Sequence, residues 1–170
     1  MGVVEDIRVQ LRAILADNNV NSLSYNDTMY RNIPTHLLSA EMIEREIGSK
    51  ARRDMRSTRC VTIIDENGGF LENALSITSV PDTNTFEVGI HVADITAFIS
   101  AESILDKEAR SRGIDVYHTV FEKVPLWPDF LKEECTNLVQ GKDRFAFSVI
   151  WTMNSLGEVT DTWYGKTVIK

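Results

Sequence analysis

Apolar runs of strand length alternate with short polar interruptions through the middle of the chain, from Cys60 to Phe98. The runs are rich in β-branched and aromatic residues, and the interruptions contain the Gly, Pro, Asn and Asp residues that turns require. This pattern predicts three strands packed as a meander. Their predicted bounds are 61–64, 75–80 and 86–92.

Apolar residues recur at helical spacing elsewhere in the chain. A long amphipathic helix is expected at 3–17. Shorter helices are expected to begin at a Ser or Asn cap and to end near a glycine or a turn. They run through Tyr30 after Ser24 or Asn26, from Ser39 to near Gly48, from Ser103 through Arg112, and from Asp129 to about Thr136.

The C-terminal part of the chain returns to strand patterns. Residues 115–124 form a predicted extended run. A hairpin is expected from 145–153 and 158–169, with Trp151 and Trp163 packed across it because cross-strand aromatic pairs are a common stabilising unit.

Composition narrows the class of protein. The 170 residues are 43% apolar and 25% charged, which is an ordinary globular balance. Two cysteines and the lack of a long apolar run indicate free thiols in an intracellular compartment, the cytoplasm or the nucleus, and no membrane segment. We therefore predict an α+β fold, a mostly antiparallel sheet with flanking helices. Its predicted parts are a helical connecting segment, 1–49, and a sheet domain, 50–170.

The distribution of charge bears on nucleic-acid binding. The formal net charge of −7 argues against broad, sequence-independent binding, because neutralisation of phosphates supplies most of that affinity. A local basic run nevertheless precedes the first predicted strand and consists of Lys50, Arg52, Arg53, Arg56 and Arg59. It indicates either a track for RNA or a solvated helix end, whose cations suit the negative C-terminus of the preceding helix.

Several separate motifs carry a family resemblance. They are, in chain order, Ala74-Leu-Ser, Glu87-Val-Gly-Ile-His-Val-Ala-Asp-Ile-Thr, Leu105-Asp-Lys-Glu-Ala-Arg-Ser-Arg-Gly, Val116-Tyr and Asp143-Arg-Phe-Ala-Phe-Ser-Val-Ile-Trp. Over roughly residues 50–170 they resemble the N-terminal half of a ribonuclease II (RNB) domain of the exosome-associated eukaryotic branch. The resemblance implies descent from processive 3′-to-5′ hydrolytic exoribonucleases. It also implies that the chain stops about midway through the domain, and that 1–49 resembles a connection from an upstream OB-type barrel.

The resemblance locates the residues that the family uses for chemistry. Its members carry four aspartates, in a run of the form D-P-x-x-x-x-D-x-D-D-A-L-S, which hold magnesium. Aligned back from Ala74-Leu75-Ser76 without gaps, the four positions hold Ile64, Phe70, Glu72 and Asn73. A one-residue deletion in the turn would instead bring Asp65 onto the first position.

Magnesium requires near-octahedral oxygen coordination at about 2.0–2.1 Å, and two-metal hydrolysis needs enough carboxylates to hold both ions. We therefore interpret Asp65, Glu72 and Asn73 as a vestigial metal site that holds no metal or only weak magnesium. The alternative is that Asp65, Glu66 and Glu72 are solvated carboxylates of a turn and a strand face. The histidines His36, His91 and His118 have no partner at ligand spacing, so zinc is not expected.

Two further correspondences concern RNA. Tyr117 matches the family tyrosine that stacks on a base near the RNA 3′ end, a contact worth about 1–3 kcal/mol per base. The segment Arg53-Asp-Met-Arg56 resembles the end of the basic run that precedes the metal-binding stretch in the family. The resemblance thus implies RNA contacts by Tyr117, Arg52, Arg53 and Arg56. The alternative for Tyr117 is a core or sheet-face tyrosine.

The sequence favours a catalytically inactive RNA-binding or scaffold module of RNA decay or processing, a pseudoenzyme. One alternative is a weakly active magnesium-dependent 3′-to-5′ exoribonuclease, and another is a protein–protein adaptor in an exosome-like complex. The expected partners are single-stranded RNA and a protein, or the remainder of the RNB domain. A half-domain should also leave the edge of its last strand unpaired and expose apolar surface. That surface is expected at Phe145, Phe147, Val149 and Trp151, or on their opposite faces.

Overall fold

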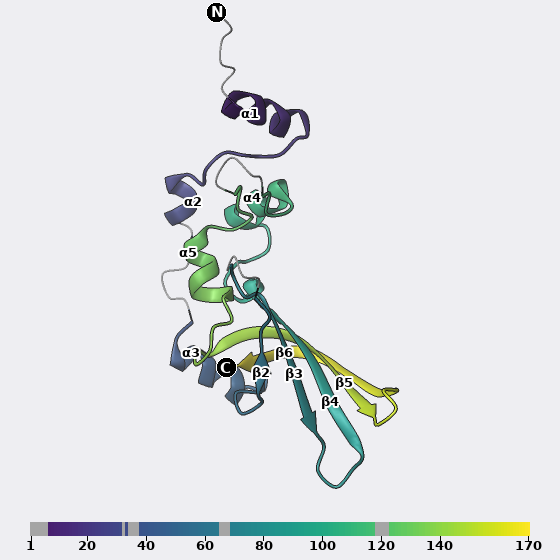
Figure 1. Ribbon diagram of the computed structural model, residues 1–170. Coiled ribbons are helices and arrows are strands. Elements are labelled where there is room, and N and C mark those ends of the chain that lie inside the picture. Colours follow the sequence, from purple (N-terminus) through teal and green to yellow (C-terminus); the bar gives the residue numbers. More distant parts are fainter. Residues whose placement is uncertain (1–6, 32, 34–37, 65–68, 118–122) are drawn as a thin grey trace, which may run out of the picture. The chain divides into compact units, whose positions relative to one another are not determined.

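The computed structural model describes residues 7–31, 33, 38–64, 69–117 and 123–170 (Figure 1). The chain forms two compact units that alternate along the sequence. The helical unit comprises Met1–Pro34 and Ile99–Asp129, and the sheet unit comprises Thr35–Phe98 and Phe130–Lys170. This grouping differs from the predicted division after residue 49, because 99–129 belongs with the N-terminal segment.

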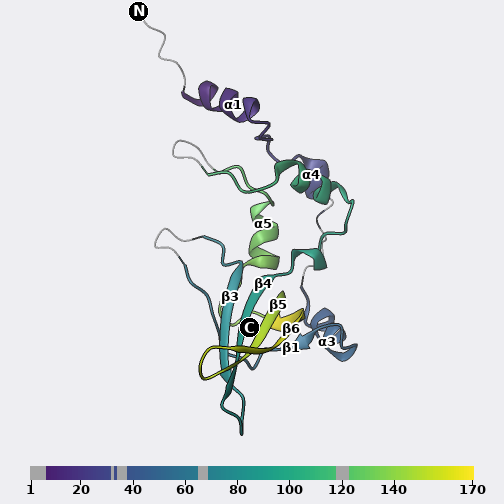
Figure 2. The same ribbon diagram turned by 90° about the vertical axis from the view of Figure 1, so that its right-hand side faces the viewer.

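The sheet unit is built on one six-stranded sheet with the order β1-β6-β5-β4-β3-β2 (Figure 2). Neighbouring strands from β2 to β6 pair antiparallel, and β1 pairs parallel with β6. The predicted meander, the hairpin and the mostly antiparallel α+β fold are therefore confirmed. The strands are β1 (Arg53–Asp54), β2 (Cys60–Val61), β3 (Asn73–Ser79), β4 (Thr85–Ala93), β5 (Arg144–Asn154) and β6 (Val159–Ile169).

Capping residues place the helices where the sequence predicts them. The side chain of Ser39 accepts a backbone N–H in the first turn of α3 (Ala40–Gly48), and Ser103 does the same for α4 (Ile104–Arg112). Gly113 ends α4 with a φ of +78°, a conformation that favours glycine. No helix in the described part of the chain is long and apolar enough to cross a membrane. The remaining helices are α1 (Ile7–Asp17), α2 (Asp27–Arg31), α5 (Asp129–Leu131), the 3-10 turn η1 (Ile95–Ala97) and the π-helical turn η2 (Lys132–Thr136).

Two predicted strands are shorter than expected. Of the run 61–64, only Val61 lies in a strand. In the run 115–124, Val116 and Val124 face each other in an isolated antiparallel bridge, so the prediction of one continuous strand is wrong. Residues 118–122 of that run and residues 3–6 of the first predicted helix lie outside the described residues.

The two tryptophans of the C-terminal hairpin do not pack against each other. Trp151 lies opposite Thr162, and Trp163 lies opposite Ile150. Since residues directly opposite share a face and successive residues alternate, the two indole rings lie on opposite faces of the sheet. The predicted pairing is wrong because it needed the register, which the apolar pattern does not supply.

The last strand is not the edge of the sheet. Arg53 pairs with Thr167 and Asp54 with Val168, which places β1 beside the C-terminal end of β6. The prediction of an unpaired last strand is wrong at this end. The other described residues of β6, from Val159 to Lys166, have β5 as their strand partner and no paired strand on the outer side.

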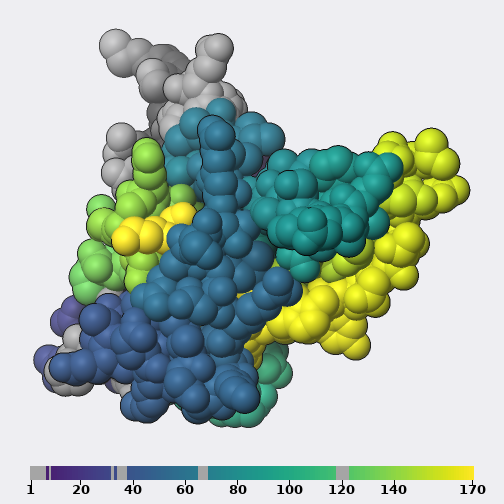
Figure 3. Space-filling view, turned by 90° about the horizontal axis from the view of Figure 1, so that it is seen from below, coloured from purple at the N-terminus to yellow at the C-terminus, as the bar shows by residue number. Residues whose placement is uncertain are grey.

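One face of the sheet covers a hydrophobic core, whose buried members are Met55, Ala74, Leu138, Ala146, Ile150 and Ile169. Among the described residues, the apolar side chains of the other face are largely exposed. On it, Phe147 is 44% exposed, as predicted, whereas Phe145 is fully buried because the ring of Phe98 stacks on it at a centroid distance of 6.0 Å. The paired β3–β4 and β5–β6 hairpins lie side by side (Figure 3). We call their uncovered side the open face, and its exposed apolar residues are Val61, Leu75, Ile77, Phe86, Ile90, Val92, Phe147 and Tyr164.

Candidate functional site

Glu72, the acidic residue that remains in the predicted metal site, is paired with a lysine of the same chain. Its carbonyl oxygen accepts the backbone N–H of Ala93 at 2.9 Å, which fixes Glu72 at the entrance of β3. Its Oε1 lies 3.7 Å from Nζ of Lys132, whose side chain is 3% exposed. The same Nζ lies 5.6 Å from the centre of the Phe70 ring. An ammonium group therefore stands beside the Glu72 carboxylate.

The remaining positions of the predicted metal site offer few oxygen ligands. Asn73 begins β3 and is exposed, and Ile64 is 56% exposed and apolar. Asp65 and Glu66 lie outside the described residues. Within the residues that the structure describes, no group of three or more His, Cys, Asp or Glu side chains could hold a metal ion. The described side chains thus do not fit the octahedral oxygen coordination of magnesium.

Arg52, a predicted RNA contact, is a buried structural residue. Its side chain is 2% exposed, and its Nη2 donates to Oδ2 of Asp94 at 2.7 Å. The guanidinium also lies over the ring of Phe145, 3.9 Å from its centroid, and Nε lies 3.5 Å from a carboxylate oxygen of Glu46. Because these groups surround it, Arg52 cannot reach an RNA without unfolding of the unit, and we remove it from the proposed RNA contacts.

Asp94 is the buried partner of Arg52. Burial raises the pKa of this carboxyl, but hydrogen bonds from Thr96 and Arg52 and the charge of Arg52 lower it more, so that the pKa lies below its usual value. Asp94 therefore stays ionised, and the pair joins the segment before β1 to the turn after β4.

Arg53 and Arg56 are more accessible, but both are paired. Nη2 of Arg53 lies 3.3 Å from a carboxylate oxygen of Glu87, and its guanidinium lies 5.3 Å from the centroid of the Trp163 ring. Arg53 keeps 41% of its side chain exposed. Arg56 forms ion pairs with three carboxylates, those of Asp54, Glu44 and Asp143. Hydrogen bonds with these carboxylates raise the pKa of Arg56.

Tyr117 belongs to the helical unit and is 73% exposed. Its hydroxyl donates to Oδ2 of Asp115 at 3.3 Å. This exposure excludes the alternative in which Tyr117 is a core residue. The ring face is open to solvent, which is the condition for stacking on a base.

A buried chain of hydroxyls around His91 escaped the sequence analysis. Nε2 of His91 lies 2.9 Å from Oγ of Ser76, and Nδ1 lies 2.7 Å from Oγ of Ser148. The latter lies 2.7 Å from Oγ1 of Thr167, which donates to the carbonyl of Ala146 at 3.3 Å. The register could have indicated this network, because all four side chains fall on the same face of β3 to β6.

The network fixes the proton positions on His91. Since Thr167 donates to a carbonyl, it accepts from Ser148, and Ser148 in turn accepts from Nδ1–H of His91. Burial lowers the pKa of His91 and so favours the neutral ring. In the neutral ring with a proton on Nδ1, Nε2 accepts the Ser76 hydroxyl.

The sequence model of the RNB domain matches residues 52–170. The chain belongs to the RNB domain family. It is 37% identical over 173 residues to DIS3-like exonuclease 2 of Schizosaccharomyces pombe, covering 100% of this chain and 18% of the relative. It is 34% identical over 165 residues to the Inactive exonuclease DIS3L2 of Arabidopsis thaliana, covering 97% of this chain and 15% of the relative.

Among solved structures, this RNB chain resembles that of yeast Ssd1, a pseudonuclease, with a TM-score of 0.80 and 28% identity. The match covers 99% of this chain and 21% of the other. The chain thus spans less than a quarter of the length of these three proteins.

Proposed function

We propose that the chain is a catalytically inactive RNB module that binds single-stranded RNA or serves as a scaffold in RNA decay or processing. The observation that carries this proposal is the ion pair between Glu72 and Lys132. The ammonium lies 3.7 Å from the one carboxylate that remains at the four aligned positions. A metal ion on Glu72 would have to displace this buried lysine, because two cations beside one carboxylate repel each other.

The proposed inactivity follows from the chemistry that hydrolysis needs. A divalent ion activates the attacking water and stabilises the charge on the phosphate, and it must be held by several carboxylates. Phe70 and Ile64 supply no oxygen, and Asn73 supplies no charge. The likeness to two proteins described as an inactive exonuclease and a pseudonuclease supports this proposal.

The proposed RNA contacts are Tyr117, Arg53 and Arg56. Tyr117 offers an exposed ring for stacking, and Arg53 keeps part of its guanidinium exposed. Binding is weak, salt-sensitive and indifferent to sequence, because stacking and phosphate contacts read no base edge and the net charge is −7.

A 5′-labelled single-stranded RNA tests both parts of the proposal. With the parent chain in magnesium or manganese, we expect no shortening of the RNA. A ladder that shortens from the 3′ end and disappears in Glu72→Ala would show that the chain is an active nuclease, as in the alternative proposal of weak magnesium-dependent activity.

Filter binding at low salt then tests the RNA contact. Tyr117→Ala should weaken binding about tenfold, since a stacked base contributes about 1–3 kcal/mol. Tyr117→Phe is the matched control, because it keeps the ring and should bind like the parent. Equal binding by all three chains would remove Tyr117 from the site.

A second proposed function, that of a protein–protein adaptor in an exosome-like complex, rests on the open face. Eight exposed apolar side chains on one face are more than monomeric proteins usually leave in contact with water. We propose that a protein partner, or the remainder of an RNB domain, covers them. The free thiols of Cys60 and Cys135 support an intracellular location, the cytoplasm or the nucleus.

A further inference from the structure

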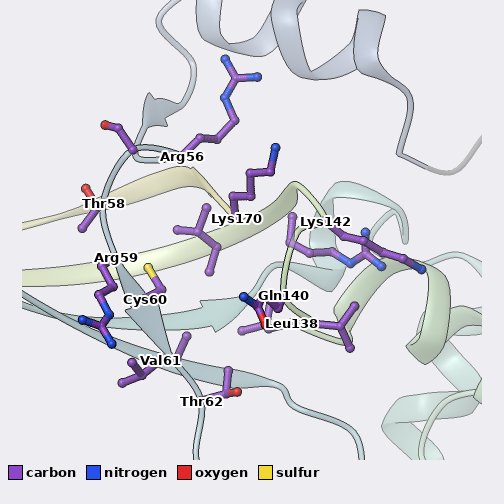
Figure 4. Close-up of a pocket in the computed structure, with 15 residues that line it drawn as sticks. Arg56, Thr58, Arg59, Cys60, Val61, Thr62, Leu138, Gln140, Lys142 and Lys170 are labelled. Carbon is purple, nitrogen blue, oxygen red and sulfur yellow. The ribbon is translucent and has the colours of Figure 1, made fainter.

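The sheet unit contains an open pocket of about 560 Å³. Of the proposed RNA contacts, Arg56 alone is among its lining residues. The pocket lies between the segment from Arg56 to Thr62, the segment from Leu138 to Lys142, and the C-terminal end of β6. Figure 4 shows Arg59 on one side and Lys142 on the other, and the side chain of Lys170 points toward Arg56. In Figure 3 the yellow C-terminal end of the chain lies between the green and blue segments. The volume of the pocket is that of an ordinary small-molecule site.

The charge of the pocket is opposite to that of the chain. Among the lining residues there are cations and no Asp or Glu, although the formal net charge of the chain is −7. The cationic residues are Arg56, Arg59, Lys142, Arg144 and Lys170. A concave surface lined by one sign of charge concentrates its field and attracts ions of the other sign.

Two of these cations hold the pocket wall together. Arg56 is paired with Asp54, Glu44 and Asp143, as described above. Arg144 is 5% exposed and donates to the backbone carbonyls of Asn137, Asp143 and Glu133. These contacts fix the two segments on either side of the pocket, so that the site is formed before any ligand arrives.

The other cations are available to a ligand. The side chains of Arg59 and Lys142 are exposed, and neither forms a hydrogen bond or ion pair with the described residues. Lys170 lies 3.9 Å from Asp143 and keeps 51% of its side chain exposed. The hydroxyls of Ser57, Thr58 and Thr62 and the amide of Gln140 line the same pocket.

The floor of the pocket is apolar. Ala74, Leu138 and Ile169 are between 2% and 6% exposed, and Cys60 packs against them. A ligand that suits this pocket carries an anionic group for the rim and a flat or apolar body for the floor.

We propose that this pocket binds a phosphate group attached to a nucleoside, with the phosphate at the cationic rim to which Arg59, Lys142 and Lys170 belong. A guanidinium matches two phosphate oxygens with a pair of charge-assisted hydrogen bonds, and an ammonium adds a point charge. The phosphate can belong to a free nucleotide or to the backbone of a single strand. The inference goes beyond the proposed function, because it concerns a site apart from Tyr117 and Glu72 and does not require RNA.

Titration of the ¹⁵N-labelled chain with adenosine 5′-monophosphate tests the inference by amide chemical shifts. We expect shifts in the segments 56–62 and 138–142, and no such shifts with adenosine, which lacks the phosphate. Arg59→Gln combined with Lys142→Gln should weaken binding at least about tenfold, since hydrogen bonds to charged groups are the strong ones. Arg12→Gln combined with Lys166→Gln is the matched control, because it removes two exposed cations outside the pocket and should bind like the parent.

A competing single-stranded RNA distinguishes the two sources of the phosphate. Displacement of the nucleotide assigns the pocket to an RNA backbone, and simultaneous binding assigns it to a free nucleotide. The inference is overturned if the nucleotide causes no shifts in the two segments, or if the Arg59 and Lys142 variant binds it as the parent does. RNA binding that depends on Tyr117 would stand in either case, so failure of the pocket is separate from failure of the proposed function.

Discussion

Replacement of Arg52 by alanine should destabilise the sheet unit severely. Measuring the stability of this variant distinguishes a structural role of Arg52 from a role in RNA binding. The side chains of Arg52 and Asp94 are 2% and 4% exposed, and they meet at 2.7 Å. Arg52→Ala leaves the Asp94 carboxylate buried with the hydroxyl of Thr96, and of the described cations only the more distant charge of Lys166 still acts on it. It also removes the guanidinium from the ring of Phe145.

The expected loss is about 3–5 kcal/mol, the usual cost of removing one partner of a buried ion pair. A domain of this size is stable by about 5–15 kcal/mol, so the variant should lose a large share of its stability. Arg53→Ala is the matched control, because its ion pair with Glu87 is exposed and should contribute about 0–1 kcal/mol. Arg52→Lys keeps the charge but loses the planar guanidinium, so its stability should be intermediate between those of Arg52→Ala and Arg53→Ala.

Equilibrium unfolding in urea, followed by tryptophan fluorescence, measures the effect as a change in midpoint. The pKa of Asp94 is lowered in the folded state, so its contribution is present above the unfolded pKa of about 3.9 and is lost as the pH falls through the folded value. The difference between parent and Arg52→Ala should therefore shrink in acid. A folded Arg52→Ala chain within 1 kcal/mol of the parent that binds RNA more weakly would refute this reasoning and restore Arg52 as an RNA contact.

Three further predictions concern the sheet. His91 has a lowered pKa in the folded chain, so the unfolded chain binds more protons below about pH 6.5. The free energy of unfolding should therefore fall as the pH drops below that value. The urea midpoint of His91→Leu should depend less on pH than that of the parent. Gly89→Ala places a Cβ 2.6 Å from Oγ of Ser76 and should cost about 1–3 kcal/mol in the same assay, whereas Gly48→Ala, with open space around it, should not destabilise α3; equal effects would contradict the steric argument. The parent chain should self-associate through the open face in sedimentation, and Ile77→Asp with Phe147→Asp should shift it to monomer; a parent that stays monomeric at all concentrations would show that the face needs no cover.

The sequence predicts those parts of the fold that depend on neighbouring residues. Ser39 and Ser103 cap helices through contacts within one turn, and Gly113 ends α4 through its own backbone conformation. Strand periodicity and turn residues likewise mark the hairpin of β5 and β6. Such signals lie within a few residues and need no knowledge of the tertiary fold.

The errors concern contacts between residues distant in sequence. In the sequence, Arg52 is one cation of the basic run. The burial of its side chain depends on Asp94 and Phe145, which lie 42 and more residues away. The tryptophan pairing failed because a shift of one residue in register moves a side chain to the other face. The phosphate pocket could not be predicted for the same reason, since it joins three segments that only the sheet brings together.

The contacts that hold the sheet together do not depend on the segment that resembles the family's metal-binding run. Arg52, Asp94 and His91 hold the strands together from positions outside the run from Ile64 to Asn73, so replacements in that run leave these contacts in place. The carboxylate of Glu72 pairs with the buried ammonium of Lys132 from the same chain. A lysine ammonium neutralises that charge, but it has no open coordination position for a water and a phosphate oxygen, which a catalytic metal must offer. If the chain is inactive as proposed, hydrolysis should require removal of Lys132 as well as carboxylates at the aligned positions, and RNA degradation assays of chains with either change alone should show no shortening of the RNA.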